Sequence, residues 1–285
     1  MAQTMKVPKF WINELAWSDY NNAIALPSDH FRTLPVNPTA FTSANIATTY
    51  QLANPFCFIL GHSGLSSIAI EDSSGSVITT TGTLINEDAV LNGWSLMELD
   101  ATPTSITAAG EIGSIIIGSS WSPPFSPELS VNITYDYSGV KSTTTKGGAT
   151  LTNSFYHGNP LWGNSLGAWE LGQAGTTQEL SRSGRKIFDI SFSFLSDSDI
   201  FPATLNLATD AEANYTDDTL NTGTDDFYGQ VIHKLGGALP FIFSPDKDST
   251  ALDNFSICKF DQNSFSFQQT SPSLYSVKMK IMEIW

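Results

Sequence analysis

The sequence predicts a mainly β protein made of two antiparallel domains, each a β-sandwich or jelly-roll-like structure, with one short helix in the C-terminal domain. Three observations support this prediction. Apolar and polar residues alternate with a period of two in several segments after residue 128, as in strands with one buried face. Shorter apolar runs in the first hundred residues are separated by turn-forming residues. A length of 285 residues accommodates two such domains.

Short strands separated by turns are expected in the first domain. The clearest apolar run, residues 56–60, is Phe-Cys-Phe-Ile-Leu, and it ends at the break Gly61-His62-Ser63-Gly64. Residues 67–71 and 77–81 flank the Ser-Ser-Gly-Ser segment 73–76, which is typical of a hairpin loop. Further strands are expected at 94–99 and 114–117.

A proline-rich segment separates the two predicted domains. Residues 121–127 contain three prolines, which lack backbone donors and therefore do not occupy the interior of a sheet. We place the boundary there. The prediction is a first β domain over 1–122 and a second β domain over 123–285.

Three alternating segments are expected as half-buried strands of the second domain. They cover residues 129–137, 187–194 and 275–281. Their predicted inward residues are Leu129, Val131, Ile133, Tyr135 and Tyr137, then Phe188, Ile190, Phe192 and Phe194, and finally Tyr275, Val277, Met279 and Ile281. A shift of one residue would expose these side chains and bury charge.

One helix is predicted near 225–235, and a long loop or arm is predicted near 196–222. Thr224 is a candidate N-cap, and Phe227, Val231 and Leu235 form an apolar stripe expected to pack on one sheet. Lys234 and the following Gly236-Gly237 are typical of a helix end. The stretch 196–222 lacks periodicity and is rich in Asp, Asn and Thr, which favours an exposed arm.

Composition excludes several classes of function. Lys and Arg total 13 and Asp and Glu total 28, so the formal charge of −15 repels nucleic-acid phosphates. We therefore expect no nucleic-acid binding. No segment has the length and hydrophobicity of a membrane-spanning helix, so we expect no membrane insertion either. Cys57 and Cys258 are too few and too far apart for a disulfide framework or a zinc site.

No catalytic, cofactor-binding or metal-binding residues are predicted. The G-x-S-x-G motif of a nucleophile elbow occurs at Gly163-Asn164-Ser165-Leu166-Gly167. The residues before it, however, cannot form the central strand that such an elbow requires. The four histidines lack metal-binding spacing. Asp197 with Asp199 and Asp246 with Asp248 leave a calcium site as an alternative to solvated turns.

Aromatic residues and one histidine are candidates for contact with a glycan or a protein partner. Tryptophan rings stack on sugars, but they also fill sandwich cores and assembly interfaces, and the core or interface interpretation is favoured. His62 follows a predicted core strand and could bridge that strand to a loop. The candidates are His62, Trp94, Trp121, Trp162 and Trp169.

Three segments resemble structural proteins of bacteriophage tails, of the distal-tail, tail-tip or minor tail protein type. Residues 9–13, Lys-Phe-Trp-Ile-Asn, together with 56–63 resemble an N-terminal galactose-binding-like sandwich, although Ser63 replaces an Asn of the usual Gly-His-Asn turn. Residues 111–118 are similar to the strand that closes such a module. Residues 237–246, with the alternating strand that ends near Glu283, resemble the C-terminal strands of minor tail proteins.

The resemblance implies a non-enzymatic virion protein, made in the host cytoplasm, that forms part of a ring at the distal tail or baseplate and connects the tail tube to tip or fibres. Its implied partners are copies of itself and other tail proteins. Unpaired strand edges and a long arm suit such contacts. Two alternatives stay open. The first is a carbohydrate-binding adhesin module for host-surface glycans, and the second, which is less favoured, is a polysaccharide-degrading enzyme.

Overall fold

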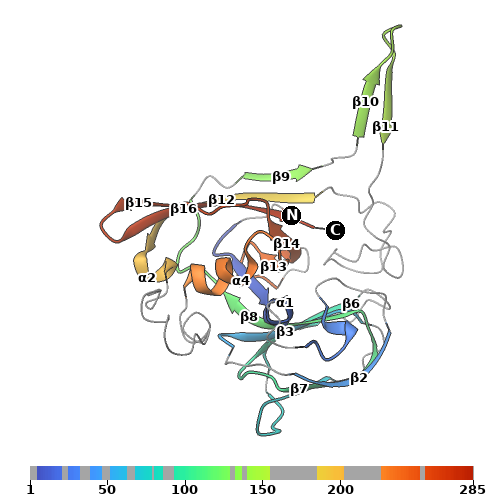
Figure 1. Cartoon of the computed structure of the whole chain (residues 1–285), viewed down its shortest axis with the longest axis vertical. Coiled ribbons are helices and arrows are strands. Elements are labelled where there is room, and N and C mark those ends of the chain that lie inside the picture. Colours follow the sequence, from blue (N-terminus) through green and yellow to red (C-terminus); the bar gives the residue numbers. More distant parts are fainter. Residues whose placement is uncertain are drawn as a thin grey trace.

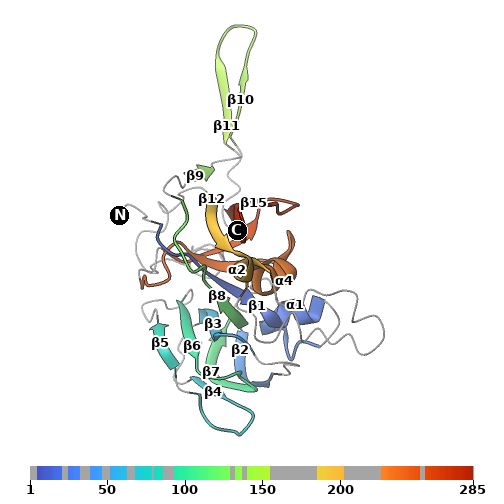
Figure 2. The same cartoon turned by 90° about the vertical axis from the view of Figure 1, so that its left-hand side faces the viewer.

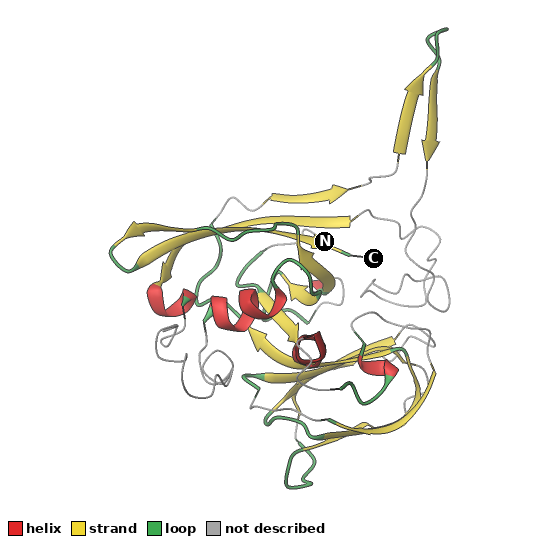
Figure 3. Ribbon diagram, in the orientation of Figure 1, coloured by secondary structure: helices red, strands yellow, loops and turns green. Residues whose placement is uncertain are grey.

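The structure, a computed structural model, describes residues 5–20, 25–32, 39–46, 52–62, 68–78, 80–85, 93–128, 132–136, 140–154, 185–201, 226–250 and 254–284. Strands dominate these residues, and the few helices are short (Figure 3). Each pair of neighbouring strands is antiparallel. The mainly β, antiparallel class predicted from the sequence is therefore confirmed.

Eleven of the described strands form one sheet, the main sheet, which runs through the molecule (Figure 1). Its order is β5 (Thr80–Ile85), β6 (Gly93–Leu99), β3 (Pro55–His62), β8 (Ser114–Trp121), β1 (Lys9–Asn13), β13 (Phe241–Ser244), β14 (Ser256–Phe260), β16 (Leu274–Glu283), β12 (Arg185–Ser196) and β9 (Asn132–Asp136), with β15 (Phe267–Ser271) also paired to β16. Strand β1 is central, because it pairs with β8 on one side and β13 on the other.

A second layer covers the N-terminal half of the main sheet. This small sheet has the order β2 (Thr39–Asn45), β7 (Ser105–Ile112) and β4 (Ile68–Glu71), and it lies beneath β3 and β6 in Figure 1. One core joins the layers, with Cys57 and Ile59 of β3 packed in the same cluster as Ile106 and Ala108 of β7. The alternate residues of β3, Phe56 and Phe58, belong to a different cluster. Strand β3 is buried on both faces, which explains its uninterrupted apolar run.

The C-terminal half of the main sheet packs against a short helical segment. A π-helical turn η3 (Tyr228–Ile232) continues into α4 (His233–Leu235), and the segment lies between the β9–β12–β16 layer and the N-terminal layers (Figure 3). Phe227, Val231 and Leu235 are buried in the same core cluster as inward residues of β12 and β16. The predicted helix and its packing face are therefore confirmed.

The ends of this helical segment are determined by Asp226 and Gly236. The Gly229 backbone N–H donates to Asp226 Oδ1 at 2.6 Å, so Asp226 caps the first turn. Gly236 has a φ of 50°, a conformation that favours glycine, and it ends α4 as predicted. The predicted cap Thr224 lies outside the described residues.

The prediction of a single helix is wrong. Helix α1 (Glu14–Tyr20) follows β1, a 3₁₀ turn η1 (Asp29–Phe31) lies further along, and α2 (Asp197–Ile200) follows β12. Asn13 Oδ1 accepts a hydrogen bond from the Ala16 backbone N–H at 3.1 Å, which is a local helix-start signal. Residues 197–200 of the predicted arm are thus helical, whereas 202–222 lie outside the described residues.

Two of the three predicted alternating segments, those of β12 and β16, confirm the sequence pattern with one exception, whereas Leu129, Val131 and Tyr137 of the third lie outside the described residues. In β16 Val277, Met279 and Ile281 are buried as predicted, and in β12 so are Phe188, Ile190 and Phe192. Phe194, however, is 69% exposed and Leu195 is buried. The pairing of β12 with β16 shifts register between Phe192 and Leu195, and this bulge reverses which residues face the core.

Two strand assignments in the first domain also differ from the prediction. Residues 111–118 form the end of β7 and the start of β8, two strands in different sheets, rather than one closing strand. The return strand expected at 77–81 is reduced to one bridge, between Glu71 and Val77. From Thr80 the chain belongs instead to β5, which pairs with β6.

The third sheet is a two-stranded hairpin of β10 (Val140–Thr144) and β11 (Thr150–Ser154). It projects away from the other elements in both views (Figures 1 and 2). The division into domains 1–122 and 123–285 stays a prediction. Strand β8 does end at Trp121, the first residue of the proline-rich segment.

Candidate functional site

His62 lies at the end of β3 and is 6% exposed. Its Nε2 is 2.8 Å from Ser95 Oγ on β6, so the ring bridges two neighbouring strands. Burial lowers the pKa of His62, and a backbone hydrogen bond with Trp94 opposes this effect. These contacts give His62 a structural role in the main sheet.

Trp94 and Trp121 are core residues in this structure, with exposed fractions of 1% and 3%. The Trp94 ring stacks on Phe58 at 5.4 Å between centroids. Trp121 packs against Phe10 and Phe227. Neither ring presents a face on which a sugar could stack, so both agree with the core interpretation favoured above. Trp162 and Trp169, like the Gly163–Gly167 motif, lie outside the described residues.

The acidic pairs considered for calcium have local structural roles. Asp199 closes a capping box with Ser196 at the start of α2. Asp246 forms an ion pair with Lys6 and accepts the Asp248 backbone N–H at 3.1 Å. Within the described ranges, no group of three or more His, Cys, Asp or Glu residues could hold a metal ion.

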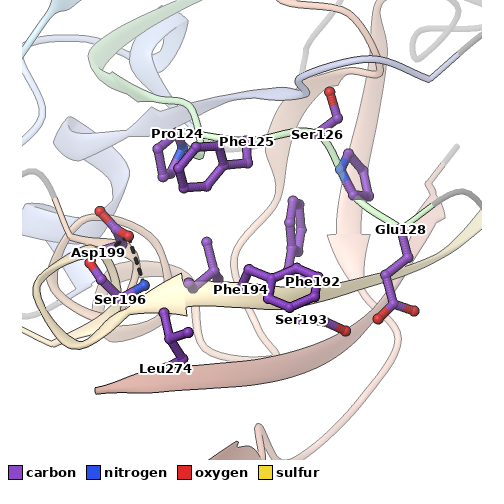
Figure 4. A pocket seen from close by; sticks show the side chains of 12 residues that line it. Pro124, Phe125, Ser126, Glu128, Phe192, Ser193, Phe194, Ser196, Asp199 and Leu274 are labelled. Carbon is purple, nitrogen blue, oxygen red and sulfur yellow. Dashed lines mark hydrogen bonds between the residues drawn. The ribbon is translucent and has the colours of Figure 1, made fainter. Parts of the chain in front are cut away.

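An apolar groove opens between the proline-rich segment and the end of β12. Its volume is about 840 Å³. Figure 4 shows Pro124 and Phe125 on one side of the groove, with Phe192, Phe194 and Leu274 on the other. The other lining residues are Ser126, Pro127, Glu128, Ser193, Leu195, Ser196 and Asp199. We refer to this site as the Phe125–Phe194 groove.

Two large apolar side chains of the groove are open to solvent. Phe125 is 59% and Phe194 is 69% exposed. The β12 bulge turns Phe194 outward, and the prolines beside Phe125 keep that segment out of the sheet. Both side chains line one apolar groove, and contiguous exposed apolar surfaces mark protein–protein contact sites.

The charged residues that line the groove are both acidic. Glu128 Oε2 accepts a hydrogen bond from Ser191 Oγ at 3.2 Å, and the Glu128 backbone N–H donates to Ser191 O at 2.9 Å. Asp199 is held by the Ser196 backbone and hydroxyl (Figure 4). The lining residues include no lysine or arginine. The groove therefore suits an apolar partner that carries positive charge.

The β10–β11 hairpin is the second exposed feature. Its turn is closed by hydrogen bonds between Thr145 and Ala149, and Gly148 has a φ of 82°, which favours glycine. Leu151 is 62% exposed on its surface. The hairpin forms a sheet by itself, and two strands alone are only marginally stable in water. A contact with another surface would stabilise it.

A buried polar cluster connects distant parts of the chain beneath α1. Lys234 Nζ forms an ion pair with Glu14, and both side chains are almost fully buried. Ser119 Oγ also donates to Glu14, and Lys234 Nζ lies 3.1 Å from Gln230 Oε1. These groups satisfy one another, as buried charges must, and they connect α1, β8 and the η3–α4 segment. We assign them to stability.

Sequence reasoning missed both exposed features, although each has a signal. Phe194-Leu195 places two large apolar residues side by side in an alternating strand, which indicates a bulge. Lys146-Gly147-Gly148 between two threonine-rich runs is typical of a hairpin turn. No local signal shows that Phe125 and Phe194 line the same groove, because 69 positions separate them.

Comparison with protein-family models, curated proteins and solved structures finds no match to this chain. Its helices, as far as they are described, are all too short or too polar to cross a membrane. The functional conclusion therefore depends on the sequence pattern and on the geometry above.

Proposed function

We propose that this chain is a non-enzymatic structural protein of a bacteriophage tail, part of a ring at the distal tail or baseplate that connects the tail tube to tip or fibres. The assignment to a tail comes from the sequence resemblance. The observation that supports an assembly role is the projecting β10–β11 hairpin, which has no hydrogen-bonded strand neighbour outside itself among the described residues. A ring subunit can contact its neighbour through such an arm.

The Phe125–Phe194 groove gives independent support to an assembly role. An exposed aromatic surface of this kind is an aggregation risk for a protein that acts as a monomer. It is an advantage for a subunit that buries the surface on assembly. For the adhesin alternative, the buried positions of Trp94 and Trp121 add no support.

The proposal is tested on purified tailed particles. An antibody raised against the full chain should label the distal end of the tail in electron micrographs, and the chain should appear in the protein content of those particles in several copies per tail. A chain that is found only free in the lysate and never in particles would contradict the proposal. An antibody against a capsid protein serves as the control for label position.

A further inference from the structure

We propose that the β10–β11 hairpin of one copy docks into the Phe125–Phe194 groove of a second copy, so that the chain assembles with itself head to tail. The proposal deepens the proposed function, on which it rests, by naming the contact that would build a ring. The backbone of both surfaces belongs to the described part of the chain.

The two surfaces are complementary in charge. Residues 138–154 contain Lys141 and Lys146 and no Asp or Glu, although the whole chain carries a formal charge of −15. The groove has Glu128 and Asp199 and no basic residue. A lysine-bearing hairpin is therefore attracted to this groove, and most other faces of so acidic a chain would be repelled from it.

The two surfaces are also complementary in hydrophobicity. Five large apolar side chains are exposed among the described residues: Tyr20, Val77, Phe125, Leu151 and Phe194. Three of the five lie on the hairpin or in the groove. Insertion of Leu151 between Phe125 and Phe194 would remove all three from water at once, which is the usual driving force for association.

The hairpin does not reach the groove of its own chain in this structure. Asp136, four residues before the hairpin, pairs with Arg185 at the start of β12, whereas Phe194 lies nine residues further along that strand. At about 3.3 Å per residue the separation is roughly 30 Å. The hairpin also points away from the main sheet (Figures 1 and 2). The occupant is therefore a second copy.

The positions of the two surfaces determine the type of assembly. Donor and acceptor lie at opposite ends of the β9–β12 layer, so each copy offers one hairpin and one groove. Such a contact is heterologous, and repetition gives a closed ring or an open filament. A ring is the result that the proposed tail function requires.

Cysteine cross-linking of the full-length chain tests the contact directly. Leu151→Cys and Phe194→Cys variants are purified separately, mixed and oxidised, and the products are separated on a non-reducing gel. The mixture should give a disulfide-linked pair that neither variant gives alone. Native Cys57 and Cys258 are both buried, and burial raises the pKa of each thiol, so they should not react.

A matched pair controls for random collision. Val77 is as exposed as Leu151, at 62%, but it lies elsewhere on the surface. A mixture of Val77→Cys and Phe194→Cys should give no linked pair. Equal yields from both mixtures, or none from the Leu151 mixture with the native circular dichroism retained, would overturn the proposal.

Charge reversal provides a second, non-covalent test. Lys146→Glu and Glu128→Lys should each weaken self-association by about tenfold in sedimentation measurements, because each places like charges together. The double variant should regain the native association, and added salt should weaken the native and the double-variant association to a similar extent. Lys247→Glu, an exposed lysine outside both surfaces, makes the same charge change and should have no effect. Equal weakening by Lys247→Glu would contradict a specific contact.

The outcomes also separate this proposal from the proposed function. Specific cross-linking with no label on tailed particles would retain the hairpin contact and reject the tail assignment. Labelled tails without specific cross-linking would retain the tail assignment and reject the hairpin contact. A chain that stays monomeric at about 100 μM and fails to cross-link would reject the contact outright, since docking of this kind is expected to be at least micromolar.

Discussion

Gly118 of β8 shows how a single residue allows two segments to meet. A Cβ atom placed on Gly118 would lie 1.8 Å from the Ile12 carbonyl oxygen and 2.7 Å from the Glu14 backbone nitrogen. Both atoms belong to the backbone at the junction of β1 and α1, which cannot move aside as a flexible side chain can. The close approach of β1 to β8 therefore requires glycine here.

Replacement of Gly118 should destabilise the fold. Gly118→Ala is expected to lower the free energy of unfolding by about 1–3 kcal/mol or more, because the added methyl group overlaps backbone atoms. Denaturant unfolding followed by circular dichroism measures the change. Gly147→Ala is the control, since the nearest atom to its added Cβ is 3.9 Å away. Indistinguishable midpoints for the two variants would be inconsistent with this packing.

The buried ion pair of Glu14 and Lys234 makes a second prediction at the residue scale. Lys234→Met leaves the Glu14 carboxylate buried without its main partner, and such a loss costs about 3–5 kcal/mol. The double variant Glu14→Gln/Lys234→Met should be more stable than Lys234→Met alone, because no unpaired charge stays buried. Thermal unfolding of both variants tests this order, and the reverse order would argue against the pair.

His62 should make stability depend on pH. Burial lowers its pKa in the folded state, so between that value and the ordinary value of about 6.5 the unfolded chain binds more protons. The free energy of unfolding should therefore fall as the pH drops below about 6.5. His62→Gln should reduce this fall. The check is denaturant unfolding at pH 7 and pH 5; equal pH dependence in the native protein and the His62→Gln variant would refute the role of His62.

At the scale of elements, the bulge in β12 decides which side chains reach solvent. Strict alternation would bury Phe194, but the register shift after Phe192 buries Leu195 and exposes Phe194. The same shift creates one wall of the groove. A single irregularity in a strand thus produces the surface on which the proposed self-assembly depends.

The bulge predicts opposite effects for two neighbouring substitutions. Leu195→Ala should cost about 2–5 kcal/mol, because it leaves a cavity in the core. Phe194→Ala should change the free energy of unfolding by less than about 0.5 kcal/mol, because its ring is exposed. Both are measured by denaturant unfolding at a concentration low enough to keep the chain monomeric. A larger loss of unfolding free energy for Phe194→Ala than for Leu195→Ala would contradict the bulge and support strict alternation.

At the scale of the whole molecule, the two halves of the chain contribute strands to one sheet and side chains to the same core clusters. Strand β1 pairs with β8 and β13, and one core cluster contains Phe10 and Trp121 together with Phe188 and Phe243. A second cluster combines Phe56 and Phe58 with Phe255 and Ile257. Because these contacts cross the predicted boundary at 122/123, the halves should stabilise each other.

The common sheet and core clusters predict cooperative unfolding of the two halves. Differential scanning calorimetry of the full chain should show one main transition for the main sheet, and a fragment of residues 1–122 should be much less stable than the same residues in the full chain. Two well-separated transitions, with the fragment as stable as the whole, would instead support independent domains. The β10–β11 hairpin should contribute little to the transition, since neither of its strands pairs with another strand among the described residues.

The sequence by itself determined the antiparallel β class, the inward faces of β12 and β16 up to the bulge, and the apolar stripe of the helical segment, because alternation and helical period are local properties of the chain. The tertiary structure decided that β1 joins both halves of one sheet, that Trp94 and Trp121 are enclosed by the core, and that Phe125 and Phe194 line one groove. These features depend on contacts between residues far apart in sequence, and no local pattern specifies which distant strand becomes a neighbour.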